Sequence, residues 1–300
     1  MENKYNRLEE YLAEKKQIVD QALENYVPDK KITKVWDSMR YSLKAGGKRL
    51  RPVLTIAVSE LFNTPLEYVL PTACAIEMIH TQSLIHDDLP GMDNDDLRRG
   101  KPTNHVVFGE AIAIIAGDAL FAQAFYTISK QTPKEVNPEN IIKVMVDLSH
   151  SSGPDGMCGG QAMDITLEKE GGEINDAVLQ YIHTHKTGDM IRTSVRCGAI
   201  LSNATQEQLN NLTMYSENIG LAFQIVDDIL DITGETKELG KTTGKDVTQN
   251  KVTYPRLYGL EESRKMAERC IENAINNLES FGEKAYYLKL LAEYILNRKS

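Results

Sequence analysis

The chain has few of the features that indicate a disulfide framework, a zinc site or a nucleic-acid-binding surface. Its four cysteines, Cys74, Cys158, Cys197 and Cys270, include no Cys-x-x-Cys pair, which disfavours both a zinc site and disulfides. With a formal net charge of -9, the chain lacks the basic surface that nucleic-acid binding requires. These absences predict cysteines buried as small apolar residues in a reducing cytoplasm, and no nucleic-acid partner.

Long hydrophobic runs and strand-like alternation are also scarce. No apolar run is expected to reach the roughly 18 residues that span a membrane, so no stable membrane insertion is predicted. Residues 1–4 lead into a charged amphipathic segment and not into a signal peptide, which favours a cytoplasmic location. Alternation of period two is almost absent, and this argues against a fold built on a large sheet.

Apolar residues recur instead at helical spacing along most of the 300 residues. This periodicity predicts helices over residues 4–25, 32–43, 52–62, 66–88, 110–130, 138–152, 155–168, 174–201, 206–232, 261–280 and 283–298. The 110–130 segment is apolar nearly all round, so it is expected in the core or at a subunit interface. The polar interval 232–253 is expected to be either a lid over a site or a disordered segment. No linker stands out, which predicts one all-α domain over residues 1–300.

The first stretch with chemical character joins the end of an apolar helix to a turn. Asp87 and Asp88 close the helix, a Pro-Gly pair breaks it, and Asp93 follows from the turn. Carboxylates held this closely repel one another unless a cation lies among them, and Mg²⁺ takes one or two carboxylates together with water and phosphate. The alternative, an exposed acidic patch, suits Asp95 and Asp96 but fits carboxylates flanked by Leu and Ile poorly.

A second aspartate cluster lies far downstream in another apolar helical stretch. Asp227 and Asp231 are four residues apart and share a helix face, whereas Asp228 lies about 100 degrees around the helix. Ile, Val and Leu flank this cluster too, so an exposed acidic patch is again disfavoured. The two clusters together indicate a magnesium-dependent site more strongly than either motif alone.

Basic residues gather in two groups that suit anionic ligands. Lys48, Arg49 and Arg51 follow a Gly-Gly pair just before a predicted helix, where backbone donors add to the side chains. A helix C-cap followed by surface cations explains these three residues equally well. Arg98 and Arg99 form the second group. Two acidic and two basic groups suit two phosphorylated ligands, one held through metal and one held directly.

One histidine shares a helical stripe with the first aspartate. His80, Ser83 and Asp87 are spaced at i, i+3 and i+7, so they project from one side of the helix. A lone histidine on an apolar helix is more often a hydrogen-bonded core residue than a ligand. Its alignment with Asp87 leaves both interpretations of His80 open.

The motifs resemble those of a known family, the trans-prenyl diphosphate synthases, which make geranyl, farnesyl and geranylgeranyl diphosphate. Four blocks match in the family's order along the chain: Gly46–Pro52, Asp87–Arg99, Gly159–Gln161 with His185–Thr187, and Gln224–Asp231. Leu239–Thr242 and Thr253–Pro255 extend the match. The resemblance implies the isoprenoid synthase fold, a single all-α domain with about ten or more helices around a central cavity.

The resemblance also implies a role for each matching position. It implies three Mg²⁺ ions per active site, with ligands at Asp87, Asp88, Asp93, Asp227 and Asp231 and with Asp228 in a supporting catalytic position. The positions that hold isopentenyl diphosphate are matched by Lys48, Arg51, His80 and Arg99. Those that hold the allylic diphosphate are matched by Arg98, Lys186, Thr187, Gln224 and Lys241, of which Lys186 and Lys241 are also implied to be catalytic.

The implied reaction is ionisation, condensation and elimination. A dimethylallyl, geranyl or farnesyl diphosphate ionises, the allylic cation alkylates the double bond of isopentenyl diphosphate, and a proton is lost. A water-excluding cavity must protect the cation. The family also implies a homodimer. A terpene cyclase is disfavoured by the Asp-Asp second motif and the isopentenyl-binding basic block, and a non-catalytic modulatory subunit is disfavoured because both aspartate motifs are intact.

In this family, product length depends on the residue five positions before the first aspartate, here Gln82. Bacterial members that make farnesyl diphosphate typically carry a bulky aromatic there, so Gln82 favours growth to the C20 geranylgeranyl product. Helical geometry alone indicates Ser83 and Ile79 as the chain-length positions. Gln82 is long enough to obstruct the tail in part, and the C15 farnesyl product stays open as the alternative.

Overall fold

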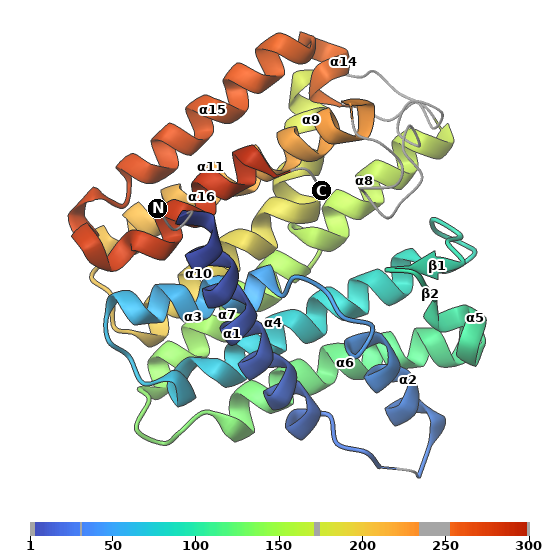
Figure 1. Cartoon of the computed structure of the whole chain (residues 1–300). Coiled ribbons are helices and arrows are strands. Elements are labelled where there is room, and N and C mark those ends of the chain that lie inside the picture. Colours follow the sequence, from blue (N-terminus) through green and yellow to red (C-terminus); the bar gives the residue numbers. More distant parts are fainter. Residues whose placement is uncertain (1–3, 31, 171–174, 234–252, 299–300) are drawn as a thin grey trace.

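The computed structural model describes residues 4–30, 32–170, 175–233 and 253–298, which form a helical bundle (Figure 1). The helices of the first half are α1 (Lys4–Tyr26), α2 (Lys34–Leu43), α3 (Leu50–Leu61), α4 (Leu66–Asp87), α5 (Asn104–Phe108), α6 (Glu110–Gln131) and α7 (Pro138–Ser152). Those of the second half are α8 (Met157–Glu170), α9 (Asp176–Ile182), α10 (Asp189–Leu201), α11 (Gln206–Thr233), α14 (Tyr254–Tyr258), α15 (Leu260–Asn276) and α16 (Tyr286–Asn297). Within the described residues the only strand pairing is a short antiparallel hairpin of β1 (Leu97–Arg98) and β2 (Lys101–Pro102). The predicted all-α class is confirmed.

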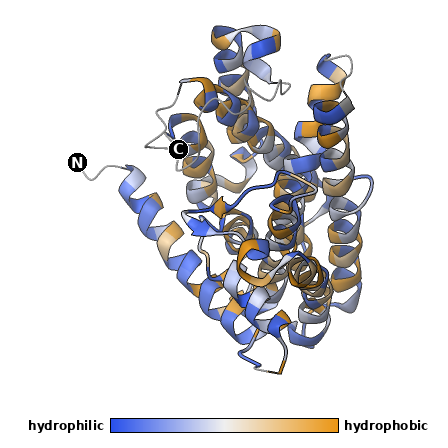
Figure 2. Ribbon diagram, turned by 90° about the vertical axis from the view of Figure 1, so that its right-hand side faces the viewer, coloured by the Kyte–Doolittle hydropathy of each residue, from blue (hydrophilic) through white to orange (hydrophobic). Residues whose placement is uncertain are grey.

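Helices α4 and α6 run side by side through the lower part of the bundle in Figure 1 and carry much of its core. Nearly every residue from Val69 to Ile79 is buried, because α4 is covered by α3, α6 and α10. A second apolar cluster joins α3, α10, α11, α15 and α16, and a smaller one joins α11 to α14. In Figure 2 the helices inside the bundle carry many hydrophobic residues, whereas the long N-terminal helix is mostly hydrophilic. The aspartate-bearing ends of α4 and α11 are thus fixed by extensive packing.

The segment predicted as one helix over 174–201 is divided. A π-helical turn, η1 (His183–Gly188), separates α9 from α10. Such a turn widens the helix locally and commonly lies at functional sites, where it changes the direction in which side chains project. Here it carries Lys186 and Thr187, two of the matching positions. Periodicity cannot detect it, because one wide turn leaves the surrounding apolar pattern helical.

The C-terminal helices also differ in their bounds from the prediction. The helix expected over 261–280 ends at Asn276, and the next begins with a 3₁₀ segment, η2 (Glu279–Ala285), before α16. Gly282 inside η2 has a φ of 59 degrees, a left-handed conformation, and it lies at the break expected between residues 280 and 283. The polar interval predicted as a lid or disordered segment falls mostly on residues 234–252, which lie outside the described residues.

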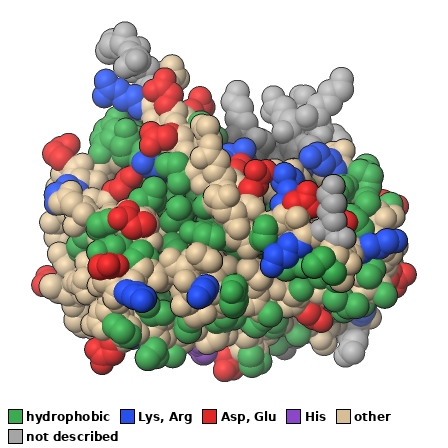
Figure 3. Space-filling model, turned by 90° about the horizontal axis from the view of Figure 1, so that it is seen from below, with side chains coloured by type: hydrophobic (Ala, Val, Ile, Leu, Met, Phe, Trp, Pro, Cys, Tyr) green, Lys and Arg blue, Asp and Glu red, His purple; other side chains and the backbone are tan. Residues whose placement is uncertain are grey.

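Helix α6 is apolar on two sides, as its sequence predicts, but only one side is covered. Ala113, Ala116 and Leu120 are fully buried, whereas Ile115 and Tyr126 are 48% and 56% exposed. Seen from below in Figure 3, apolar side chains lie open to solvent between scattered charged ones. Among the described helices, α6 alone is long and apolar enough to cross a membrane, so the expectation that no segment reaches that length was too strict. One such helix is weak evidence, since core helices of soluble proteins pass the same test.

Candidate active site

The first aspartate motif is built at the C-terminal end of α4. The Asp93 N–H donates a hydrogen bond to the Asp87 carbonyl oxygen at 2.9 Å, so the turn folds back on the helix as its sequence predicts. Burial raises the pKa of the Asp87 carboxyl to about 6; the Lys186 ammonium opposes this rise and the Asp93 carboxylate adds to it. Asp87 is therefore a shielded carboxylate that faces both another carboxylate and a lysine.

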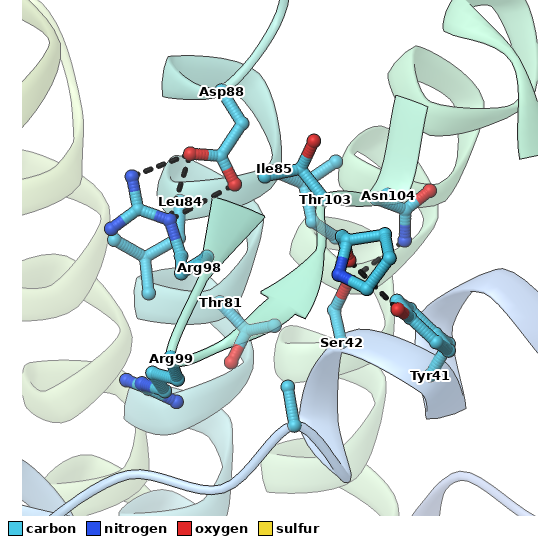
Figure 4. A pocket seen from close by; sticks show the side chains of 12 residues that line it. Tyr41, Ser42, Thr81, Leu84, Ile85, Asp88, Arg98, Arg99, Thr103 and Asn104 are labelled. Atoms are coloured by element: carbon cyan, nitrogen blue, oxygen red, sulfur yellow. Dashed lines mark hydrogen bonds and ion pairs between the residues drawn. The ribbon is translucent and has the colours of Figure 1, made fainter. Parts of the chain in front are cut away.

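The Asp88 side chain is buried and points toward the β1–β2 hairpin. Its carboxylate accepts hydrogen bonds from Arg98 Nε at 2.7 and 2.9 Å and from Arg98 Nη2 at 2.5 Å (Figure 4). Burial raises the pKa of Asp88, and the Arg98 guanidinium opposes that rise. In the same view Arg99 points away from Asp88, although the two arginines are adjacent in sequence. The hairpin thus directs one arginine to the aspartate motif and the other to a different neighbourhood.

Three of the four residues matched to isopentenyl diphosphate binding lie together. Arg51 Nη1 is 3.4 Å from His80 Nε2, and Arg99 lies near enough to act electrostatically on both. The Arg99 guanidinium also donates to the Gly46 carbonyl oxygen, two residues before Lys48 in the sequence. Burial lowers the pKa of Arg51, and burial together with the Arg51 charge lowers the pKa of His80 well below its ordinary value. Arg51 Nε is buried and has no hydrogen-bond partner within the part of the chain that the structure describes. Crowded cations with an unsatisfied donor favour an anionic ligand.

Arg49, the third cation of the same run, has a different role. It turns into the bundle at the start of α3, where Nη1 pairs with Glu77 at 2.6 Å and Nε pairs with Asp20 at 2.8 Å. Both Arg49 and Glu77 are almost completely buried. Of the two explanations left open for this basic run, an anion site suits Lys48 and Arg51, whereas Arg49 ties α1 and α4 to the turn.

The π-helical turn η1 brings further matching positions to the site. Lys186 Nζ pairs with Asp164 of α8 at 2.5 Å, and Thr187 is half-buried beside it. The close approach of α8 depends on Gly160, where a Cβ atom would lie 2.3 Å from the Lys186 backbone nitrogen. His183 Nδ1 lies 3.3 Å from the Gln224 side-chain oxygen, so η1 also contacts the helix that carries the second motif.

In the second motif, Asp227 is paired with a residue that the sequence gives little reason to select. Arg298 Nη2 donates to Asp227 at 2.7 Å and to the Phe223 carbonyl oxygen at 2.8 Å, and its guanidinium lies over the Phe223 ring. The charge of Arg298 also lowers the pKa of Lys48, after the larger effect of burial. Arg298 follows α16, 71 residues from Asp227. The only sequence signal is a lone arginine near the C-terminal end of the chain.

The remaining aspartates of this motif differ in environment. Asp231 is half-buried one turn beyond Asp227. Asp228 is buried, accepts the N–H of Tyr254 at 2.9 Å and lies 3.5 Å from His183 Nε2. Its carboxylate therefore ties the start of α14 to α11 and η1, which suits a supporting position.

The π-helical turn η1 links the two motifs. The Lys186 charge acts on the Asp87 carboxyl, and His183 of the same turn contacts Gln224 and Asp228. The charges of Arg298 and Asp227 act on Lys48, which places the basic turn before α3 near the second motif. Lys241, matched to the allylic diphosphate, lies outside the described residues. Of the chain-length positions, Ile79 is fully buried, whereas Gln82 and Ser83 are half-buried.

The donor set fits Mg²⁺. No cluster of three or more His, Cys, Asp or Glu side chains suited to metal binding lies among the described residues. Mg²⁺ does not require one, because it typically takes one or two carboxylates and completes its octahedron with water and substrate phosphate. The half-buried Asp87 carboxylate with Asp93 beside it supplies such oxygens, and cations for the phosphate lie nearby.

Known proteins include clear relatives of this chain. The family model described as polyprenyl synthetase matches residues 32–291. The chain belongs to the polyprenyl synthetase family. A geranylgeranyl diphosphate synthase of Cyanophora paradoxa is 48% identical over 97% of the chain and 96% of that protein. A dimethylallyltranstransferase of Fischerella ambigua (strain UTEX 1903) is 50% identical over 97% of the chain and 84% of that protein.

Solved structures of the family have the same fold. An FPP/GFPP synthase from Zymomonas mobilis, solved without ligand, superposes with a TM-score of 0.86 at 37% sequence identity, covering 97% of the chain and 99% of that structure. As a member of the polyprenyl synthetase family, the protein is a prenyltransferase with the all-α isoprenoid synthase fold.

Proposed function

We propose that the protein joins isopentenyl diphosphate head-to-tail (1'-4) to an allylic diphosphate and that geranylgeranyl diphosphate is its main product. The observation that carries the proposal is the pairing of two unlike sites: the half-buried Asp87 carboxylate at one, and the crowded Arg51–His80 group with an unsatisfied donor at the other. A metal-bound diphosphate suits the first and a directly bound diphosphate suits the second. Farnesyl diphosphate is the alternative product, supported by the likeness to an FPP/GFPP synthase.

Different residues bind the allylic diphosphate and isopentenyl diphosphate. Asp87 and Asp93 would hold Mg²⁺ at the first motif, and Asp227 with Asp231 would hold it at the second. When bound, the metal supplies positive charge that stabilises the departing diphosphate. Lys186 adds its ammonium group to the same leaving group.

The second diphosphate meets a separate set of donors. Lys48, Arg51 and Arg99 direct their charges at it, and His80 stays neutral because burial keeps its pKa low. Neutral imidazole donates a hydrogen bond without adding a fourth charge to the group. The apolar faces of α4 and α10 exclude water from the allylic cation, which would otherwise be hydrolysed.

A homodimer built on α6 and a cytoplasmic location complete the proposal. Ile115 and Tyr126 lie exposed on α6, and Ile142 and Val146 on α7 are 60% and 59% exposed. Apolar side chains of this number on neighbouring helices are typical of a subunit interface. The buried inner face of α6 supports a helix packed in a bundle over one inserted in a membrane.

The experiment is to incubate the purified chain with Mg²⁺, isopentenyl diphosphate and each of the dimethylallyl, geranyl and farnesyl diphosphates, and to size the products. We expect C20 product in the wild type and a loss of turnover by about three or more orders of magnitude in Asp87→Ala, with the fold intact by circular dichroism. Asp96→Ala is the matched control, because its exposed carboxylate lies in the same connection between α4 and β1. Near-normal turnover of the Asp87 variant would overturn the metal role.

Product length has its own test at Gln82. Gln82→Tyr places a ring where the growing tail is expected to pass, so the product should shorten from C20 to C15. The measurement is the ratio of C20 to C15 product after hydrolysis and chromatography. An unchanged ratio would remove Gln82 from the determinants of length.

A further inference from the structure

The Gln82 side chain is held by a hydrogen-bonded chain that crosses from α4 to α6. Gln82 Nε2 lies 3.1 Å from His86 Nδ1, one helical turn on, and His86 Nε2 lies 3.1 Å from the Ile114 carbonyl oxygen. A carbonyl oxygen only accepts, so His86 Nε2 carries the hydrogen and Nδ1 is left as the acceptor. The Gln82 amide therefore donates to His86, and both ring nitrogens of His86 are hydrogen-bonded.

Gly117 on α6 makes room for the imidazole. A Cβ atom at Gly117 would lie 2.1 Å from His86 Nε2 and 2.6 Å from its Cδ2, far inside van der Waals contact. Only glycine lets the ring lie between the two helices in this position. The space at Gly117 and the carbonyl of Ile114 together fix where the His86 ring sits.

The direction of the Gln82 side chain follows from this bond. A contact between residues i and i+4 keeps a side chain along the helix surface, here toward α6. Ser83, His80 and Asp87 share a different stripe of α4. Gln82 lies five residues before Asp87, about 7.5 Å along the axis at about 1.5 Å per residue, within reach of a tail that starts at the aspartates.

We propose that His86, seated against Gly117, is a positioning residue for product length: it draws the Gln82 amide aside toward α6 and leaves the path of the growing tail open. The inference rests on the proposed condensation of isopentenyl units. Without its acceptor, the Gln82 amide turns into the path and ends elongation earlier. Product length then depends on Gln82, His86 and Gly117 together, and not on the size of residue 82 alone.

Two variants disrupt the hydrogen bond between Gln82 and His86 in different ways. Gly117→Ala displaces the ring, and His86→Phe keeps a ring but removes both nitrogens. We expect each to lower the ratio of C20 to C15 product about fivefold, the effect of one lost hydrogen bond on a two-position equilibrium. His86→Gln retains a donor and an acceptor and should restore much of the ratio. The ratio does not depend on how much enzyme is folded, so a loss of stability does not imitate the effect.

The decisive measurement repeats both variants in a Gln82→Ala background. Because this background has no amide that could turn into the path, Gly117→Ala and His86→Phe should leave its ratio of C20 to C15 product unchanged. The control, Ser129→Ala on the exposed side of α6, should change the ratio in neither background. An equal change in both backgrounds, no change in either, or a wild type whose longest product is C15 would overturn the inference. Total isopentenyl incorporation tests the proposed function separately. A wild type that forms no prenyl product would refute the proposed function, whereas the product ratio tests the role of His86.

Discussion

Replacing Asp87 by asparagine is expected to stabilise the metal-free protein while it removes activity. Burial raises the pKa of this carboxyl from 3.8 to about 6, so the charged form is disfavoured in the folded chain. The difference of about 2 units (6 − 3.8) corresponds to about 3 kcal/mol at about 1.4 kcal/mol per unit. Solvent screening of a half-buried group reduces this to about 1–2 kcal/mol at neutral pH. Asparagine has a similar shape and avoids that cost.

The direction of the Asp87 pKa shift determines the pH range over which stability changes. A carboxyl whose folded-state pKa is raised binds its proton more tightly in the folded than in the unfolded chain. The stabilising contribution of the protonated form is complete below about pH 4 and is lost as the pH rises to about 6. Above that window the wild type carries the whole penalty. The advantage of Asp87→Asn should therefore grow between pH 4 and 6 and then stay constant.

Thermal unfolding in the presence of a chelator tests this reasoning. At pH 7.5 the midpoint of Asp87→Asn should exceed that of the wild type by about 2–6 °C, and at pH 5 by clearly less. Asp96→Asn, which alters an exposed carboxylate in the same connection between α4 and β1, should unfold like the wild type. Added Mg²⁺ with inorganic pyrophosphate should reverse the order by stabilising the wild type alone. A variant that is no more stable than the wild type, or an advantage independent of pH, would refute the account of Asp87.

Two further predictions concern buried ion pairs. Glu77→Gln leaves the Arg49 charge in the core without its closest partner, so it should lower the free energy of unfolding by about 3 kcal/mol in urea titrations; a loss near zero would contradict the structural role of the pair. Arg298→Ala removes the cation that competes for Asp227, so Mg²⁺ should activate the enzyme at about fivefold lower concentration. An unchanged or higher Mg²⁺ requirement would show that Arg298 does not compete.

Much of the fold could be predicted because helical periodicity is strong in this sequence. The prediction failed at η1, where a π-helical turn interrupts 174–201 without changing the apolar pattern. For α6 the sequence left two alternatives, the core or a subunit interface, since composition does not distinguish a helix covered on every side from one whose outer side is left for a partner. Regular helices thus followed from local sequence. The π-helical turn depends on a residue distant in the chain, Gly160, which packs against its backbone.

The candidate site shows the same division. The turn that returns Asp93 to Asp87 follows from the Pro-Gly pair, so the sequence was sufficient there. No local pattern distinguishes Arg49, which turns inward to Glu77, from Arg51, which lies beside His80. The direction of a side chain in a run of cations is decided by the carboxylates that tertiary packing brings near it. Single-sequence reasoning can therefore name the residue types of a site more reliably than their individual roles.

The distribution of charge around the aspartates connects these observations. Asp88 is paired with Arg98 and Asp227 with Arg298, so the chain's own cations neutralise these carboxylates. Asp87 differs, because its side chain has no ion pair among the described residues. Burial raises the pKa of its carboxyl, and the Asp93 carboxylate adds to that rise. A cation that arrives at Asp227 must displace a guanidinium, whereas a cation that arrives at Asp87 relieves an existing penalty. Binding should therefore be strongest at the motif that ends α4, and the second motif should bind once Arg298 has moved.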